Sequence, residues 1–176
     1  MNSKLHIGTS GWSYRDWLGP FYPPTLKQTD FLKFYSTTYS TVEIDSTFYA
    51  IPRARSIENW FNKTPDNFIF SLKAPKIITH EKQLENCQED WDRFIETAGL
   101  LQHKLAVIVL QFDNKFTAPA FYKKLKIFLE QQRHPVKLAV EIRHKSWHNQ
   151  DFYNLLQNNN VALVLNDLYY LPRIIQ

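Results

Sequence analysis

The sequence alternates between short apolar segments of strand length and longer segments whose apolar residues recur at helical spacing. The predicted strands begin near Leu5, Thr41, Phe68, Leu105, Lys137 and Val161. Three of them are almost continuously apolar, which is typical of strands buried on both faces of a parallel sheet.

Five segments between these strands show helical periodicity. The most regular is Glu89 to Gln102, with apolar residues at Trp91, Phe94, Ile95, Ala98 and Leu101. The other four are Asp30 to Tyr39, Ser56 to Lys63, Ala118 to Gln131 and Gln150 to Asn158. Successive strands start about 31 residues apart, which is the size of one strand–helix unit. The repetition predicts a parallel α/β fold.

Glycine usage narrows the choice among parallel α/β folds. The chain has only four glycines and no Gly-rich phosphate loop of the Walker or dinucleotide type. A TIM-barrel-like (β/α) fold is therefore favoured over a nucleotide-binding doubly wound sheet. About six strand–helix units are present where a closed barrel needs eight. We expect residues 1–176 to form one barrel domain that is incomplete at its carboxyl-terminal end.

Composition excludes several other classes of protein. A chain that is 44% hydrophobic and 15% aromatic is not intrinsically disordered. The longest apolar run, Leu105 to Leu110, is far shorter than the roughly 20 residues of a membrane span. Residues 1–6 contain no apolar segment of a signal peptide. The single cysteine, Cys87, excludes an internal disulfide and favours a reducing compartment, so we expect a cytoplasmic protein.

The formal net charge of +4 permits an anionic partner without requiring one. The densest basic cluster is Lys123, Lys124 and Lys126, on the polar side of a predicted helix. A solvated helix face explains this cluster, so nucleic-acid binding is only weakly supported.

Polar or aromatic residues follow each predicted strand, at the end where parallel α/β proteins place their sites. The charged ones are Glu43, Lys73, Glu141, Arg143 and Asp167. Burying such charges is costly unless they are paired, so we expect them to compensate one another around a common mouth.

Five distinctive segments occur along the chain in this order: IGTSGWSYRDW, GPFYP, TVEIDSTFY, FSLKAP and AVEIRHKSW. In these segments and their order the chain resembles the YecE-like family, also called domain of unknown function 72. The resemblance extends from Ile7 to about Asp167. The resemblance implies a TIM-barrel-like fold with a polar pocket at the strand ends, and no established activity. The positions that match this pocket are Trp12, Glu43, Phe48, Tyr49, Lys73, His80, Gln111, Glu141, Arg143, His144, Trp147 and Asp167.

Three features depart from the family pattern. Asp45 stands where the family typically has Asn, and Phe112-Asp113-Asn114 replaces a Pro pair. Family members also continue for two more strand–helix units, so the resemblance implies that this chain is truncated. Six units leave two open sheet edges, which two copies of the chain can cover as a homodimer.

The pocket residues suggest a division of roles. Glu43 and Glu141 are candidates for general acid and base, with His144 assisting, since neighbouring carboxylates separate their pKa values. Lys73 and Arg143 are candidates for holding an anion. The other predicted binding residues are Trp12, Phe48, Tyr49, His80, Gln111, Trp147 and Asp167. The alternative is that each carboxylate forms a structural ion pair with Lys73 or Arg143.

The sequence requires no cofactor and assigns no metal ligand. A divalent metal is compatible with the oxygen and nitrogen donors of Glu43, Glu141, Asp167, His80 and His144. We hypothesise that the protein binds and turns over a small polar or anionic ligand, phosphorylated or sugar-like, as a hydrolase or isomerase. The alternatives are a non-catalytic module that binds nucleic acid or protein, and an inactive fragment.

Overall fold

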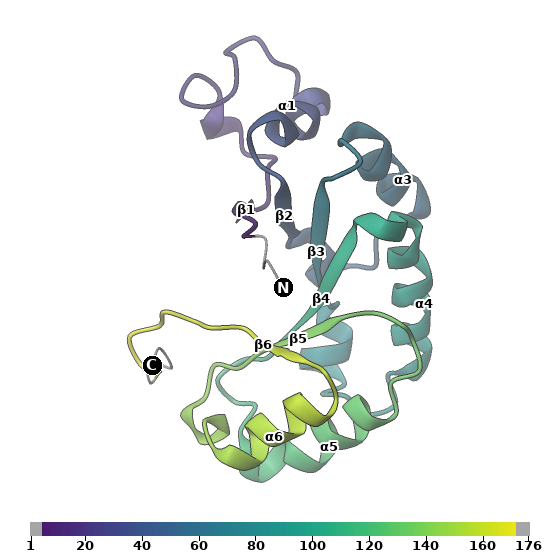
Figure 1. Cartoon of the computed structure of the whole chain (residues 1–176), viewed down its shortest axis with the longest axis vertical. Helices are drawn as coiled ribbons and strands as arrows, with labels where there is room; N and C mark the ends of the chain where they lie inside the picture. Colours follow the sequence, from purple (N-terminus) through teal and green to yellow (C-terminus); the bar gives the residue numbers. More distant parts are fainter. Residues whose placement is uncertain (1–4, 172–176) are drawn as a thin grey trace.

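The computed structural model describes residues 5–171, which form a curved parallel sheet with helices along its outer side (Figure 1). The six strands follow one another in chain order, and every neighbouring pair is parallel. They are β1 (Gly8–Ser10), β2 (Thr41–Ile44), β3 (Ile69–Lys73), β4 (Leu105–Gln111), β5 (Leu138–Glu141) and β6 (Ala162–Leu163). The predicted α/β, TIM-barrel-like fold is confirmed.

The α-helices lie between the strands and pack mainly on the convex side of the sheet (Figure 1). They are α1 (Phe31–Thr38), α2 (Ser46–Tyr49), α3 (Ala54–Lys63), α4 (Gln88–Ala98), α5 (Ala118–Glu130) and α6 (Gln150–Asn158). The shorter helical turns are η1 (Arg15–Trp17), η2 (Gln28–Asp30), η3 (Ile77–Glu81), η4 (Gly99–Lys104) and η5 (Lys145–Trp147). None of the helices within residues 5–171 has the length and apolar character needed to cross a membrane.

The helical periodicity correctly identifies the buried face of α4. Its predicted apolar positions all lie in the core, namely Trp91, Phe94, Ile95, Ala98 and Leu101. The predicted end at Gln102 is wrong, because the α-helix stops at Ala98 and continues as the tighter η4. Gln102 adopts a φ of 51°, which no α-helix accommodates.

The first strand begins three residues later than predicted, at Gly8 instead of Leu5. A Cβ atom at Gly8 would lie 2.1 Å from the carbonyl oxygen of Thr41 on β2. Only glycine therefore permits this close approach of the two backbones.

The hydroxyl group of Tyr35 joins β1 to β2. It accepts a hydrogen bond from the Thr9 amide at 2.9 Å and donates one to the Thr41 carbonyl at 3.0 Å. Burial raises the pKa of the Tyr35 phenol, so the hydroxyl remains protonated and able to donate. A side chain of α1 thus occupies a position in the backbone ladder between the first two strands.

We expect Tyr35→Phe to lower the free energy of unfolding by about 1 kcal/mol, because it removes hydrogen bonds to a partly buried amide and a partly buried carbonyl. Urea denaturation measures the loss, and faster hydrogen exchange of the Thr9 amide locates it. The control is Tyr39→Phe, since Tyr39 stacks on Tyr35 with ring centroids 4.9 Å apart but makes no hydroxyl hydrogen bond within the described chain. Equal losses for the two variants would contradict this role of Tyr35.

The two edges of the sheet carry exposed apolar side chains. Leu5 and Ile7, just before β1, are 81% and 64% exposed, and Leu165, just after β6, is 63% exposed. Unpaired edge strands with apolar neighbours are sites where another chain adds. This distribution agrees with the predicted homodimer, which stays a prediction.

Light scattering tests the dimer directly, and we expect twice the mass of one chain. Leu165→Ser should shift the protein toward the monomer, because it removes an apolar side chain from the β6 edge. Ile127→Ser, on the exposed surface of α5, is the matched control and should leave the mass unchanged. A monomeric mass for the unchanged protein at high concentration would rule out the dimer.

Candidate functional site

The first cluster of charged side chains lies at the carboxyl ends of β1, β2 and β3. The Lys73 ammonium lies 2.6 Å from Asp45 Oδ1 and 3.3 Å from Glu43 Oε1. The Ser10 hydroxyl donates its single hydrogen to Asp45 and also lies 3.2 Å from Glu43 Oε1. One lysine is therefore shared by two carboxylates, so the cluster keeps a formal charge of one negative unit.

Strand register brings these side chains together. Ser10 is paired with Glu43, and Glu43 with Ser71, so the three strands end at the same level. Since side chains alternate between the faces of a strand, Glu43 and Lys73 lie on the face opposite the buried residues of β2 and β3.

Lysine and carboxylate stabilise each other's charged forms in this cluster. Burial alone would raise the pKa of Asp45, but hydrogen bonds from Lys73 and Ser10 outweigh it and hold that pKa below its usual value. Burial alone would lower the pKa of Lys73, yet Asp45 and Glu43 raise it. Lys73 is therefore a permanently charged partner of the carboxylates.

The second cluster lies at the ends of β4 and β5. Glu141 Oε1 accepts hydrogen bonds from Gln111 Nε2 at 2.7 Å and from Arg143 Nε at 2.9 Å, and Arg143 Nη2 lies 2.8 Å away. Register places Gln111 beside Glu141. Glu141 is a buried carboxylate, whereas the side chain of Arg143 is 40% exposed. The guanidinium group therefore neutralises Glu141 while reaching solvent.

Glu43 and Glu141 belong to separate clusters. Their strands, β2 and β5, are three steps apart in the sheet, at about 4.8 Å per step along its curve. Each carboxylate is instead held by its own cation, as the ion-pair alternative predicts.

His80 lies in η3, the turn that follows β3. Its Nδ1 is 2.8 Å from the Thr79 hydroxyl, and its ring meets Phe48 edge to face with centroids 5.0 Å apart. Burial lowers the pKa of His80. Nearby charges have smaller effects: Asp113 raises the pKa of His80 and Arg143 lowers it. The imidazole is therefore neutral near pH 7, within the electrostatic reach of the second cluster.

His144 has one ring nitrogen committed to the backbone. Nδ1 accepts from the Ser146 amide at 3.2 Å and lies 2.8 Å from the Ser146 hydroxyl, so His144 caps η5. Because Nδ1 is an acceptor, the neutral ring carries its proton on Nε2. This leaves an N–H donor available to a ligand.

A pocket of about 480 Å³ opens beside Arg143 and His144. It is lined by Asn114, Arg143, His144, Lys145, Tyr169 and Tyr170. Tyr169 is completely exposed, so one of its ring faces is available to a ligand. None of the six lining residues is acidic, and two are cationic.

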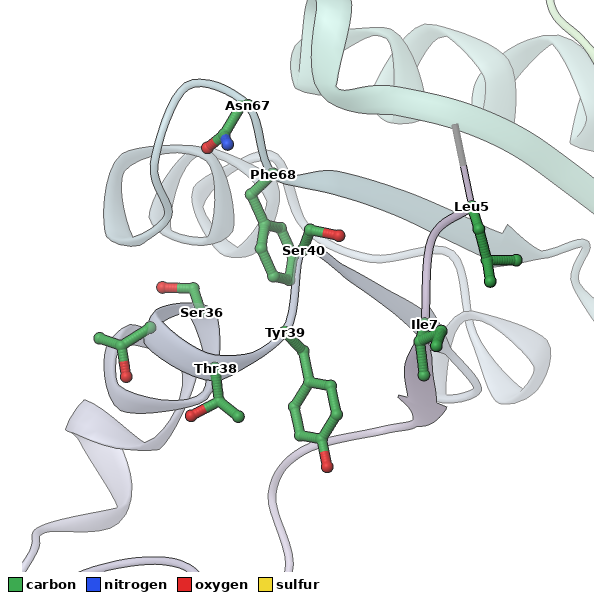
Figure 2. A pocket seen from close by; sticks show the side chains of 9 residues that line it. Leu5, Ile7, Ser36, Thr38, Tyr39, Ser40, Asn67 and Phe68 are labelled. Carbon is green, nitrogen blue, oxygen red and sulfur yellow. The ribbon is translucent and has the colours of Figure 1, made fainter. Parts of the chain in front are cut away.

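A second pocket, of about 510 Å³, lies at the opposite, amino ends of the first strands (Figure 2). Its lining combines the exposed Leu5 and Ile7 with hydroxyl-bearing residues in the last turn of α1 and directly after it, and with Asn67 and Phe68 before β3. In barrels this end serves stability, and the chemistry lies at the carboxyl ends. We therefore place the candidate site at the 480 Å³ pocket and the two charged clusters.

Four predicted site residues lie apart from these groups. Trp147 is fully buried and donates its indole N–H to the Phe116 carbonyl at 2.6 Å, so its predicted role as a pocket wall is corrected to core packing. Trp12 packs edge to face on Trp60. Tyr49 is 72% exposed at the end of α2. Asp167 is exposed and forms no ion pair within the described chain, so the predicted compensation does not extend to it.

The acidic and histidine side chains do not gather into a metal site. Within residues 5–171, no group of three or more His, Cys, Asp or Glu side chains is arranged to hold a metal ion. The two carboxylates that lie closest to a shared position, Glu43 and Asp45, surround the Lys73 ammonium instead.

Several lining residues of the 480 Å³ pocket were not predicted from the sequence. Asn114 lies in the segment that departs from the family pattern, and Lys145 directly follows the predicted Arg143 and His144. The sequence could therefore have identified Asn114 and Lys145 as candidate pocket residues. Tyr169 and Tyr170 lie beyond the last predicted strand, where no local pattern indicates a site.

Comparison with known proteins gives consistent matches along nearly the whole chain. The family model described as "Protein of unknown function DUF72" matches residues 6–173. UPF0759 protein YunF of Bacillus subtilis (strain 168) is 31% identical over 155 residues, which cover 85% of this chain and 54% of the relative. UPF0759 protein YecE of Escherichia coli (strain K12) is 28% identical over 140 residues, covering 80% and 48%. The chain thus spans about half the length of these curated relatives.

Solved structures agree with the fold. The crystal structure of a DUF72 family protein from Thermotoga maritima MSB8 matches with a TM-score of 0.78 and 32% identity, covering 97% of this chain and 68% of that one. A DUF72 family protein from Enterococcus faecalis V583 matches with a TM-score of 0.70 and 24% identity, covering 91% and 60%. The second likeness concerns the fold alone.

Asp45→Asn tests the first cluster through its pH dependence. Because the pKa of Asp45 in the folded protein lies below 3.8, its charge stabilises the fold above that pH, and the contribution disappears as the pH falls through the lowered value. We expect the substitution to lower the free energy of unfolding by about 1 kcal/mol at neutral pH, since the pair is partly exposed. The difference should shrink as the pH falls below 3.8 toward the lowered pKa.

Denaturant titrations at neutral and at acidic pH measure this effect. The control is Asp16→Asn, an exposed carboxylate without an ion pair in the described chain. A loss of stability for D45N that stays constant with pH would show that packing, and not charge, is responsible.

Proposed function

The chain belongs to the family described as protein of unknown function DUF72, and we propose that it binds a small anionic ligand at the carboxyl ends of its strands. The ligand class is a phosphorylated or sugar-like molecule. The observation that carries the proposal is the 480 Å³ pocket, whose lining contains Arg143, His144 and Lys145 and no carboxylate.

Arg143 is suited to hold the anion. Its Nε and Nη2 groups bind Glu141, so the remaining guanidinium N–H groups are available on the exposed side. An oxyanion such as a phosphate accepts two parallel N–H bonds from a guanidinium group. Lys145 adds a second full charge, and His144 adds a donor at Nε2. Lys73 has no such role, because Glu43 and Asp45 already neutralise it.

The remaining lining residues favour an organic anion over a bare inorganic one. The exposed ring of Tyr169 and the half-exposed ring of Tyr170 provide apolar faces against which a sugar ring packs. The Asn114 side chain provides both a donor and an acceptor for hydroxyl groups. The pocket volume of about 480 Å³ lies in the usual range for small-molecule sites.

We assign turnover to hydrolysis or isomerisation by proton exchange. Glu141 does not line the pocket but is bound to Arg143, which does. In hydrolysis, Glu141 accepts a proton from the attacking water as the new bond to oxygen forms and returns it to the departing oxygen as the old bond breaks, so the proton count balances. The neutral His144 ring donates a hydrogen bond from Nε2–H to the departing oxygen and keeps its proton. In isomerisation, Glu141 removes a proton from one atom and returns it to the neighbouring atom.

The alternative of nucleic-acid binding receives less support from the charge distribution. In the densest basic cluster, Lys124 forms an ion pair with Glu85 at 3.0 Å and Lys126 forms one with Glu130. These lysines are largely neutralised, so the helix surface lacks the continuous positive charge that binds a phosphate backbone.

Arg143→Gln tests the proposed anion site. We expect about a tenfold or greater loss of affinity for a sugar phosphate, because the substitution removes charge-assisted hydrogen bonds. Isothermal titration with glucose 6-phosphate and with inorganic phosphate measures the change. Lys123→Gln is the matched control, since it removes one positive charge from the exposed face of α5. Absence of saturable binding to both probes, or equal affinities for R143Q and the unchanged protein, would overturn the proposal.

A further inference from the structure

Three hydrogen-bond donors converge on one oxygen of the Glu141 carboxylate. Oε1 accepts from Gln111 Nε2 at 2.7 Å and from Arg143 Nε at 2.9 Å, and Arg143 Nη2 lies 2.8 Å from the same oxygen. A guanidinium–carboxylate pair frequently forms a two-to-two fork instead, in which each oxygen accepts one N–H group. Glu141 departs from that fork, so its second oxygen is left over.

The second oxygen, Glu141 Oε2, has no hydrogen-bond partner within residues 5–171 and is open to solvent. The Glu141 side chain is 9% exposed. In this part of the chain only two side-chain atoms are both closed to solvent and without a partner, and they belong to Gln132 and His148. A carboxylate that is nine-tenths buried therefore presents one accessible, unpaired acceptor. Burial limits the water that can solvate this oxygen, so a donor from a ligand would stabilise it.

Gln111 holds the Glu141 carboxylate in this orientation. It is the last residue of β4 and lies beside Glu141 in the strand register. Leu110 and Val140 belong to the core beneath the helices, so Gln111 and Glu141 point to the opposite, concave side of the sheet. The buried Gln111 amide binds Oε1 and keeps that oxygen between itself and Arg143. Without this contact the carboxylate could rotate into the fork and use Oε2 for Arg143.

Arg143 connects this carboxylate to the proposed anion site. The guanidinium group binds Glu141 through Nε and Nη2, and its side chain also lines the 480 Å³ pocket. Oε2 belongs to the same carboxylate, so a free acceptor lies next to the donors that would hold the anion. A ligand whose anion binds the outer N–H groups of Arg143 can place a donor on Oε2 if that donor is only a few bonds from the anion.

The charges around Oε2 restrict the kind of donor. A carboxylate oxygen only accepts hydrogen bonds, so it repels a second anionic group of the ligand. An ammonium group would be repelled by Arg143 and Lys145, which both line the pocket. A neutral hydroxyl group avoids both repulsions and donates a charge-assisted hydrogen bond to the carboxylate.

We propose that Glu141 Oε2 recognises a hydroxyl group of the anionic ligand, and that Gln111 is the positioning residue that keeps this oxygen free. The inference rests on the proposed anion site. It narrows the ligand to a phosphate ester that carries a hydroxyl group close to its phosphate, as sugar phosphates do. A simple alkyl phosphate binds Arg143 but leaves Oε2 unpaired.

Two phosphate esters with the same charge and the same number of carbon atoms separate hydroxyl recognition from anion binding. In isothermal titration, we expect glycerol 3-phosphate to bind about tenfold more tightly than propyl phosphate, the effect of one hydrogen bond to a charged group. In Glu141→Met the acceptor is absent while Arg143 still holds the phosphate, so the two esters should bind equally. Glu58→Met removes a carboxylate from the exposed surface of α3 and is the matched control, which should keep the tenfold preference.

Gln111→Leu tests the positioning role. The substitution leaves Glu141 and Arg143 in place but removes the amide donor, so the carboxylate can form the fork. We expect the preference for glycerol 3-phosphate to fall from about tenfold to about twofold, because Arg143 then occupies Oε2. A merely structural role of Gln111 would weaken the binding of both esters equally and leave the ratio of their affinities unchanged.

Each contrary result has a distinct meaning. Equal affinities of the two esters for the unchanged protein would overturn hydroxyl recognition and leave the anion site in place. Absence of saturable binding of both esters would overturn the anion site and this inference together. A tenfold preference that survives in E141M would overturn the role of Oε2, and one that survives in Q111L would overturn the role of Gln111. If E141M fails to fold, the ratios in the unchanged protein and in Q111L still decide the proposal.

Discussion

Ion pairing at the carboxyl ends of the strands is the constraint on which the rest of this structure depends. The parallel sheet brings ionisable groups partly out of water where its strands end. A buried charge without a partner costs several kcal/mol, so each carboxylate requires a cation within reach. Lys73, on the neighbouring strand, is shared by Glu43 and Asp45, and Arg143, two residues farther along the same strand end, pairs with Glu141.

The two clusters differ in what they leave available to a ligand. Lys73 is shared by two carboxylates, so this group has an excess of one negative charge and no free cation for an anion. Arg143 faces a single carboxylate and keeps part of its guanidinium group exposed beside Lys145. This asymmetry supports the proposal that an anionic ligand binds at the end of β5. The Asp45 carboxylate, where the resembled family typically has Asn, increases the asymmetry by fully occupying Lys73.

At the amino ends of the strands, hydrogen bonds take the place of ion pairs. There the backbone ladder and the helix ends require hydrogen-bond partners, and polar and cationic side chains supply them. Tyr35 bridges β1 and β2, and the buried Lys104 donates to the carbonyls of Phe61 and Thr64 at 2.7 and 2.8 Å, at the end of α3. Gln132 performs the same task by accepting hydrogen bonds from the Trp91 indole and from the amides of Arg133 and His134.

The sequence by itself determined the element order, the buried face of α4 and the strand ends as the location of the candidate site. These features depend on helix and strand periodicities and on family motifs, which are properties of short segments of the chain. It also placed Glu43, Lys73, Glu141 and Arg143 among the site residues. Only the tertiary structure decided which cation pairs with which carboxylate, that Trp147 belongs to the core, and that Tyr169 lines a pocket. These features join residues far apart in the chain, and their contacts arise from strand register and sheet curvature, which no local pattern encodes.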